Sequence, residues 1–124
     1  MELNKDQAAF YNQARERCRQ DVAEMKRIYN QRRQVMIRRL KEIGFGITID
    51  PTGAFYVFAN ARHISGDSYK LAFDILEKAH VGVTPGIDFG KNGEGYLRFS
   101  YANSMENIEE GLDRIEQYLK NMKY

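Results

Sequence analysis

The feature that most constrains this chain is a stretch of about forty residues that contains neither proline nor glycine. It runs from Asn4 to Ile43 and therefore holds nothing that would break a helix. Apolar residues recur along it at the three- and four-residue steps of one helix face: Tyr11, Ala14, Cys18, Val22, Met25, Tyr29, Val35 or Met36, Leu40 and Ile43. Asn4 followed by Gln7 is typical of a capped start and Gly44 of a stop, so we predict a helix over about residues 4–43.

Such a helix is too long for a domain of this size. At 1.5 Å per residue it would span about 60 Å, whereas a compact 124-residue domain is only about 35 Å across. The helix must therefore break or extend beyond the rest of the chain. Its first half carries an apolar stripe with no visible partner in the sequence: Phe10, Tyr11, Ala14, Cys18 and Val22. We expect the stripe to lie against another domain or subunit; the alternative is a bent helix that packs wholly on its own core.

Length and composition indicate one globular domain. A chain of 124 residues can bury one sizeable core. Its 43% hydrophobic and 12% aromatic residues exclude a disordered or collagen-like chain. No apolar run approaches the roughly 18 residues of a membrane-spanning helix, and no signal peptide opens the sequence. We therefore expect no membrane partner. The single Cys18 cannot form an internal disulfide, which favours a reducing compartment, so we expect a cytoplasmic protein.

Charge and motifs give little support for nucleic-acid binding. The net charge is only +2, although residues 1–50 carry 11 Lys/Arg against 7 Asp/Glu and residues 51–124 carry 8 against 10. A basic first half can attract polyanions, but such residues more often form the solvated face of a helix. The run Gly53–Phe58 faintly resembles the aromatic strand of an RNA-recognition motif, yet Thr52 replaces the leading basic residue and the rings do not alternate. We predict no nucleic-acid partner.

After Gly44 the pattern changes to short strands and two further helices. Turn residues separate four predicted strands: Gly46–Ile49, Ala54–Phe58, Val81–Thr84 and Tyr96–Tyr101. One helix would start at Ser65, Asp67 or Ser68, and the last one after Ser104. Their apolar stripes are Leu71, Ile75, Leu76 and Ala79, and Ile108, Leu112, Ile115 and Leu119. This order predicts an α+β fold, with a small mixed, mostly antiparallel sheet, helices packed on one face, and a long N-terminal helix in front.

Arg98 is the candidate functional residue that the strand pattern itself brings out. Side chains alternate along a strand, so Tyr96, Arg98 and Ser100 would face away from the helices. Their neighbours would face the helices: Leu97, Phe99 and Tyr101. A guanidinium in mid-sheet, with the aromatic strand 54–58 as an expected neighbour, offers a rigid fork suited to a carboxylate or phosphate. The pattern predicts an anion site; the alternatives are an arginine exposed on an open sheet face or one paired with a structural acid.

Other candidate sites are weaker. His63 and His80 have no cysteine or acid at metal-ligand spacing, so we predict no metal site. Gly90, Gly93 and Gly95 resemble a phosphate loop, but no strand precedes them and no helix follows at the required places. An Asn-Gly pair before a strand is an ordinary turn.

Three ordered motifs cover most of the second half of the chain. Pro51–Phe58 has the sequence PTGAFYVF, Val83–Gly90 has VTPGIDFG, and Gly93–Ala102 has GEGYLRFSYA. They resemble the P-x-G-A-F-Y strand, the P-G-x-x-F-G loop and the G-x-G-Y-x-R-x-S-[YF]-A strand of the class I/II (fold type I) PLP-dependent aminotransferases of the aspartate aminotransferase type. The basic helix that ends before Phe45 resembles the helix leading into that family's C-terminal small domain.

The resemblance implies roles for particular residues. Arg98 matches the arginine that binds the α-carboxylate of the substrate, in agreement with the argument from alternation. Phe55 and the loop Thr84–Gly86 match positions that border the active site. The implied cofactor is PLP, the implied substrates are an amino acid and a 2-oxo acid, and the implied partners are a PLP-binding large domain and a second subunit of a homodimer. Aspartate, alanine, aromatic and branched-chain substrates all stay open.

The rest of that family's active site has no matching segment here. The Schiff-base lysine, the acid that pairs with the pyridine nitrogen and the phosphate-binding groups belong to the large domain. We therefore expect residues 1–124 to be the C-terminal small domain, with a long interdomain helix over 1–44 and an α/β sandwich over 45–124. Such a chain would hold no catalytic or cofactor-binding residue, be inactive alone, and self-associate. The alternative is a free-standing interaction module that uses the exposed sheet face and the long helix.

Overall fold

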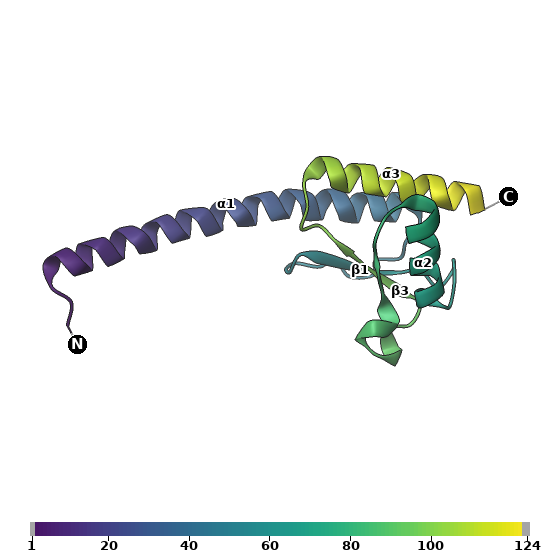
Figure 1. Cartoon of the computed structure of the whole chain (residues 1–124), viewed down its shortest axis with the longest axis horizontal. Coiled ribbons are helices and arrows are strands. Elements are labelled where there is room, and N and C mark those ends of the chain that lie inside the picture. The colour runs from purple at the N-terminus through teal and green to yellow at the C-terminus, as the bar shows by residue number, and fades with distance from the viewer. Residues whose placement is uncertain (1, 123–124) are drawn as a thin grey trace. The chain divides into compact units, whose positions relative to one another are not determined.

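The computed structural model describes residues 2–122, which form three α-helices, three strands and two short 3-10 helices (Figure 1). In chain order the elements are α1 (Lys5–Ile43), β1 (Tyr56–Asn60), α2 (Ser68–Ala79), β2 (Thr84–Pro85), η1 (Gly86–Phe89), η2 (Lys91–Gly93), β3 (Tyr96–Ser100) and α3 (Met105–Met122). The chain divides into two compact units, one up to Gln31 and one from Arg32 onward. Within the described range, no helix is long and apolar enough to cross a membrane.

The predicted long helix is confirmed as the single element α1. At its start the Asn4 N–H donates to Oε1 of Gln7 (3.0 Å) and the Gln7 N–H donates to Oδ1 of Asn4 (2.8 Å), which is a reciprocal capping box. At its end the N–H groups of Gly44 and Phe45 donate to the Leu40 carbonyl at 3.1 and 2.9 Å. Gly44 has a φ of +116°, a conformation that glycine adopts without strain.

The first unit is helical throughout from Lys5 to Gln31. Its exposed large apolar side chains include Phe10, Tyr11, Val22 and Met25, whereas Ile28 and Tyr29 are half-buried. The exposed side chains include three members of the stripe for which the sequence predicts an outside partner. Exposed apolar side chains at helical spacing are typical of a surface that another body covers.

The strands form one sheet in the order β1–β3–β2, and both strand pairings are antiparallel. On the central strand β3, Arg98 lies opposite Phe58 of β1 and Thr84 of β2. The α+β fold with a small antiparallel sheet and a long N-terminal helix is therefore confirmed.

The predicted strand Gly46–Ile49 is wrong. Only Gly46 pairs, through an isolated antiparallel bridge to Asn60, and Ile49 is 85% exposed. A β-branched run favours a strand where neighbouring side chains pack against it, and here most of the run faces solvent.

Two other strands are shorter than or shifted from the sequence prediction. β1 starts at Tyr56 because Ala54 has a φ of +65°, in the left-handed region, which interrupts an extended strand. β2 contains only Thr84 and Pro85, although Val81–Thr84 was expected to pair. Pro85 has no N–H to extend the ladder, and the chain turns at once into η1.

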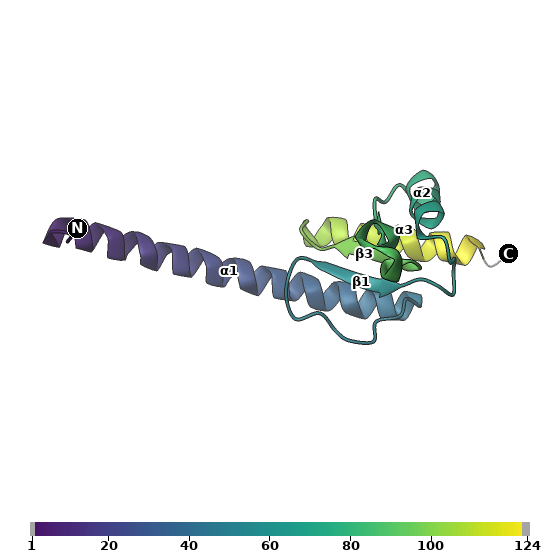
Figure 2. The same cartoon turned by 90° about the horizontal axis from the view of Figure 1, so that it is seen from below.

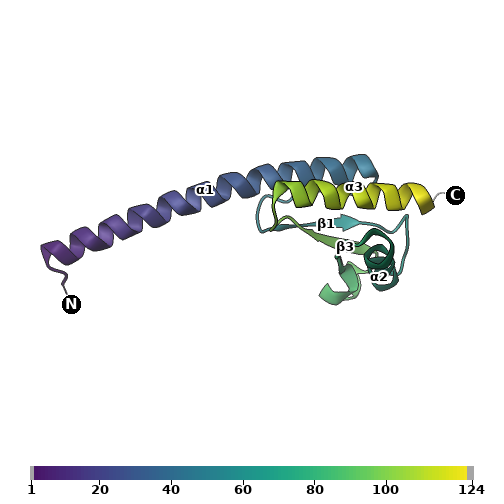
Figure 3. The ribbon, with the colours of Figure 1, turned by 45° about the horizontal axis from the view of Figure 1, so that its top comes forward.

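In the second unit the end of α1 and α3 cover one face of the sheet. Figure 3 shows the end of α1 and α3 side by side above the strands, and an ion pair of 2.6 Å joins Arg39 Nη2 to Asp113 Oδ1 between them. Burial of each large aliphatic side chain in this core contributes about 1.5–3 kcal/mol. The buried residues that meet there include Met36, Ile37, Leu40, Val57, Leu97, Phe99, Ile108, Leu112 and Ile115.

Both shorter helices start at predicted caps. Asp67, one of three candidates, accepts the Lys70 N–H at 3.0 Å at the start of α2, and Ser104 accepts the Asn107 N–H at 3.2 Å at the start of α3. Figure 2 shows α3 lying between α2 and the end of α1. α3 can therefore contact both of the other helices of this unit.

Tyr118 and Asp74 tie α3 to α2. The buried Tyr118 hydroxyl donates to Oδ2 of Asp74, whose Oδ1 also pairs with Lys78 Nζ at 2.9 Å. The hydrogen bond from Tyr118 and then that from Lys78 lower the pKa of Asp74. Burial and the adjacent Asp74 carboxylate raise the pKa of Tyr118.

Tyr118→Phe keeps the ring and removes this hydrogen bond. We expect the free energy of unfolding at neutral pH to fall by about 0.5–1.5 kcal/mol. Because folding lowers the pKa of Asp74, its carboxylate stabilises the fold fully above the unfolded pKa of about 3.9 and loses that contribution as the pH falls through the lower folded pKa. The variant should therefore lose less stability on acidification than the wild type. Urea unfolding at neutral and acid pH measures both quantities; equal acid-induced losses would contradict the assignment.

Candidate active site

The sheet face opposite the helical layer carries the candidate site. Along β3, Leu97 and Phe99 are buried, whereas Tyr96 and Arg98 are half-buried. Tyr101 is also buried, at 1% exposure. The division of this strand into a helix-facing and an open side, predicted from alternation, is confirmed.

The Arg98 guanidinium is surrounded by aromatic rings on this open face. Its central carbon lies 5.0 Å from the ring centroid of Phe89, 5.2 Å from that of Tyr56 and 5.9 Å from that of Phe55. We call Arg98 and these three rings the Arg98 site. Each ring face attracts the cation, and such contacts contribute about 0.5–2 kcal/mol depending on how far water is excluded.

The Arg98 guanidinium has no carboxylate partner among the described residues. Among the described residues Arg98 forms no ion pair, and its Nε is buried without a hydrogen-bond partner. This excludes, for residues 2–122, the alternative in which a structural Asp or Glu neutralises it. A buried donor without an acceptor costs free energy that an arriving anion would recover. A guanidinium in this setting has the donor geometry that suits a carboxylate or phosphate.

Phe55 is brought beside Arg98 by a turn that sequence reasoning did not foresee. The preceding Ala54 is in the left-handed region, and its carbonyl accepts a hydrogen bond of 2.8 Å from the Tyr101 hydroxyl. The Tyr101 N–H donates to the Phe55 carbonyl at 2.7 Å. Tyr101 therefore holds both ends of the peptide segment that carries the Phe55 ring. Phe55 itself is 44% exposed, at the edge of the site.

Phe89 is brought there by the loop that follows β2. Thr84 lies opposite Arg98 in the sheet, and Pro85 and Gly86 lead directly into η1, which ends at Phe89. A Cβ on Gly86 would lie 2.0 Å from the Gly93 carbonyl oxygen, and a Cβ on Gly93 would lie 2.3 Å from that of Gly86. The backbones of η1 and η2 thus approach so closely that only glycine fits at either position. Phe89 was not singled out from the sequence, although it is the phenylalanine of the VTPGIDFG motif.

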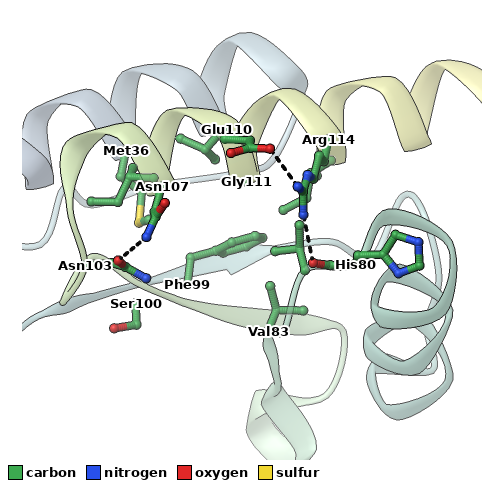
Figure 4. Close-up of a pocket in the computed structure, with 15 residues that line it drawn as sticks. Met36, His80, Val83, Phe99, Ser100, Asn103, Asn107, Glu110, Gly111 and Arg114 are labelled. Atoms are coloured by element: carbon green, nitrogen blue, oxygen red, sulfur yellow. Dashed lines mark hydrogen bonds and ion pairs between the residues drawn. The ribbon is translucent and has the colours of Figure 1, made fainter.

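A separate surface pocket of about 340 Å³ lies on the helical side of the sheet (Figure 4). Several of its polar groups already have partners within the protein: Arg114 pairs with Glu110 at 2.6 Å and donates to the His80 carbonyl at 3.4 Å, and Asn107 donates to Asn103 at 2.9 Å. It includes no residue of the Arg98 site. We therefore place the candidate chemistry at Arg98.

The comparison with known families decides the class of protein. The family model for aminotransferase class I and II matches residues 6–115, which is most of the chain. The chain belongs to this family. Arg98 and the loops that carry Phe55 and Phe89 all lie within the matched range.

Individual aminotransferases are similar to this chain over a limited part of their own length. The aspartate aminotransferase of Pyrococcus horikoshii is 48% identical over 103 residues, which are 82% of this chain and 26% of that protein. The aromatic-amino-acid aminotransferase 2 of Thermococcus litoralis is 43% identical over 87% of this chain and 28% of its own length. The crystal structure of an aromatic aminotransferase from Pyrococcus horikoshii OT3 superimposes with a TM-score of 0.84 at 44% identity, over 87% of this chain and 28% of that one. The chain thus spans about a quarter of the length of these relatives.

The structure does not bring the weaker candidates of this aminotransferase chain together. His63 is exposed, His80 is exposed at the end of α2, and the described residues contain no cluster of three potential metal ligands. The glycine amides of the suspected phosphate loop are used within the loop. Those of Gly90 and Gly93 donate to backbone carbonyls at 3.0 and 2.9 Å, and that of Gly95 donates to the Glu94 carboxylate at 2.8 Å.

These residues do not fit a PLP site. PLP chemistry needs a lysine amine held in place as a nucleophile, and groups that bind the phosphate. Each lysine among the described residues is exposed, and the loop glycines offer no unused amide. What the described part of the chain does present is one caged arginine that suits a carboxylate.

Gly86→Ala tests how the aromatic wall of the site is held. A Cβ there would also lie 2.6 Å from the Tyr96 carbonyl oxygen, so η1 must shift away from β3 and η2. We expect the free energy of unfolding to fall by about 1–3 kcal/mol or more. Gly82→Ala is the matched control, because nothing lies within 4 Å of its Cβ, and it should change stability by no more than about 0.5 kcal/mol. Urea unfolding of both variants measures the difference; equal stabilities would show that the close contact is not maintained.

Proposed function

We propose that residues 1–124 form the C-terminal small domain of a PLP-dependent aminotransferase, in which Arg98 binds the α-carboxylate of the amino acid and 2-oxo acid substrates. The observation that carries this proposal is the buried Arg98 Nε without a partner, inside a cage of three rings. Membership of the aminotransferase family supports a substrate that always carries such a carboxylate.

A carboxylate would complete the Arg98 site. Its two oxygens match the fork of a guanidinium, which allows two parallel charge-assisted hydrogen bonds. The rings beside the guanidinium exclude water and so strengthen the attraction between the charges. Phe55 and Phe89 are 44% and 52% exposed, so the site is open for ligand entry. Arg98 would thereby hold and orient the part of the substrate that all amino acids share.

This role agrees with the different names of the similar proteins. One relative is named for aspartate and another for aromatic amino acids, although both are more than 40% identical to this chain. Substrates that differ in their side chains still share the α-carboxylate. We therefore assign to this chain the recognition of the common group, and to residues outside it the choice of side chain.

The rest of the reaction is assigned to a large domain outside residues 1–124. The chain covers about a quarter of its relatives' length and its described lysines are exposed, which supports placing the Schiff-base lysine and PLP elsewhere. We expect this chain alone to be inactive. The exposed stripe of the first unit, which includes Phe10, Tyr11 and Val22, would pack against that large domain or against a second subunit of a homodimer.

A carboxylate titration of the 124-residue chain tests this proposal. The probe is sodium acetate at constant ionic strength, and the readout is the ¹H–¹⁵N NMR signal of the Arg98 Nε–H, identified by its absence in Arg98→Lys. We expect a saturable downfield shift as acetate accepts a hydrogen bond. Arg98→Lys loses the fork and should weaken acetate binding by about tenfold or more, as followed by backbone amide shifts of β3.

Arg62→Lys is the matched control for this titration. Arg62 also lies over a ring, 5.0 Å from the centroid of Tyr96, but its side chain is exposed. This variant should bind acetate like the wild type. Equal binding by the wild type and Arg98→Lys would contradict the proposed role of Arg98.

A further inference from the structure

We propose that Ser68 and Glu94 are positioning residues of the Arg98 site, which hold the Phe89 ring against the guanidinium from behind the loop. Neither residue forms a hydrogen bond or an ion pair with Arg98 in this structure, so we expect any effect on the site to pass through the loop that carries Phe89. The inference deepens the proposed function and rests on it where carboxylate affinity is concerned.

The Glu94 carboxylate connects the start of α2 to the start of β3. Its Oε1 accepts the Ser68 N–H at 2.7 Å and the Gly95 N–H at 2.8 Å. Hydrogen bonds from the Ser68 hydroxyl and amide and from the Gly95 amide hold the pKa of Glu94 below its usual range. The carboxylate is therefore ionised at neutral pH and bound to two elements that are far apart in sequence.

Ser68 extends this connection to η1. Ser68 is only 1% exposed, so its polar side chain is buried in the core. The Ser68 Oγ accepts the Ile87 N–H at 3.2 Å. Ile87 lies in η1, two residues before Phe89, and the N-cap residue of that short helix, Pro85, makes no side-chain cap bond. This contact is thus a direct side-chain restraint from α2 on the backbone that aims the Phe89 ring.

Helix capping alone does not account for these two residues. α2 already has an N-cap, since Asp67 accepts the Lys70 N–H at 3.0 Å. The Ser68 hydroxyl is directed to η1 instead of to its own helix, and Glu94 comes from outside that helix. A buried serine between a carboxylate and a loop amide costs desolvation, and its bonds to both sides offset that cost.

The consequence is a continuous series of contacts that ends at the Arg98 guanidinium. Glu94 binds Ser68, Ser68 binds Ile87, and Ile87 fixes the turn of η1 that places Phe89 5.0 Å from the guanidinium carbon. The close approach of Gly86 and Gly93 holds the same turn from its other side. Loss of the Ser68 restraint should therefore let Phe89 move without unfolding the loop.

Ser68→Ala tests the inference in the ligand-free 124-residue chain. We expect the Arg98 Nε–H signal to move, because ring currents from Phe89 change, and the nuclear Overhauser contacts between Phe89 and Arg98 to weaken. Affinity for sodium acetate should fall about three- to tenfold, as expected for the loss of one neutral hydrogen bond that orders a site. Backbone amide spectra confirm that the variant is folded.

Ser65→Ala is the matched control. Ser65 lies in the same turn, and its Oγ accepts the Asp67 N–H at 3.1 Å, but it makes no bond to η1. This variant should leave both the Arg98 signal and the acetate affinity unchanged. An Arg98 signal and a Phe89 contact that are the same in Ser68→Ala as in Ser65→Ala would overturn the inference.

A second pair of variants keeps the test valid if Ser68→Ala does not fold. Glu94→Gln retains an oxygen that can accept the Ser68 and Gly95 amides and should stay close to the wild type, whereas Glu94→Ala should behave as described for Ser68→Ala. Equal Arg98 signals in these two variants would also overturn the inference. An Arg98 signal that moves in Ser68→Ala but never responds to acetate in the wild type would support the positioning role and contradict the proposed function.

Discussion

A half-buried guanidinium without a protein counter-ion is the constraint on which the rest of this structure depends. The Arg98 Nε is buried and unpaired among the described residues, a condition that lowers stability unless something compensates for it. Three aromatic rings within 6 Å compensate in part, because their faces attract the cation without neutralising it. An arginine so placed retains its capacity to bind an anion. A protein carboxylate paired with Arg98 would instead neutralise the guanidinium and occupy its hydrogen-bond donors.

Two loops beside the sheet bring aromatic rings to that arginine. Tyr101 holds the left-handed turn at Ala54 that presents Phe55. The Gly86–Gly93 contact brings η1 close enough to β3 for Phe89 to reach the guanidinium. On the opposite, helical side of the sheet, an apolar and closely packed core keeps the strands rigid.

The parts of this arrangement that depend on local periodicity could be predicted from the sequence. The three- and four-residue spacing predicted α1, and alternation placed Arg98 on the open side of β3. The caps at Asp67 and Ser104 followed from side chains that accept backbone N–H groups. The role of Arg98 as a carboxylate site came from both alternation and the family resemblance, and its role in solution stays a prediction.

The parts that depend on tertiary contacts could not be predicted. Residues 46–49 have a strand-like sequence, but the structure places no partner strand along them beyond the bridge at Gly46. The left-handed turn at Ala54 is held by Tyr101, which is distant in sequence. Phe89 reaches Arg98 only through the close approach of two glycines seven residues apart, which no period of two or 3.6 residues reveals. The Glu94–Ser68–Ile87 contacts join three segments in the same way.

The central claim is a division of labour, in which this chain supplies the carboxylate anchor and the lysine chemistry of the aminotransferase lies outside it. The measurement that tests it most directly is to mix the purified chain with PLP, reduce with borohydride and map modified lysines by mass spectrometry. The account predicts no adduct, or weak labelling scattered over exposed lysines. A single stoichiometric lysine adduct, together with transamination of any amino acid, would contradict it and show that this chain carries a catalytic lysine of its own.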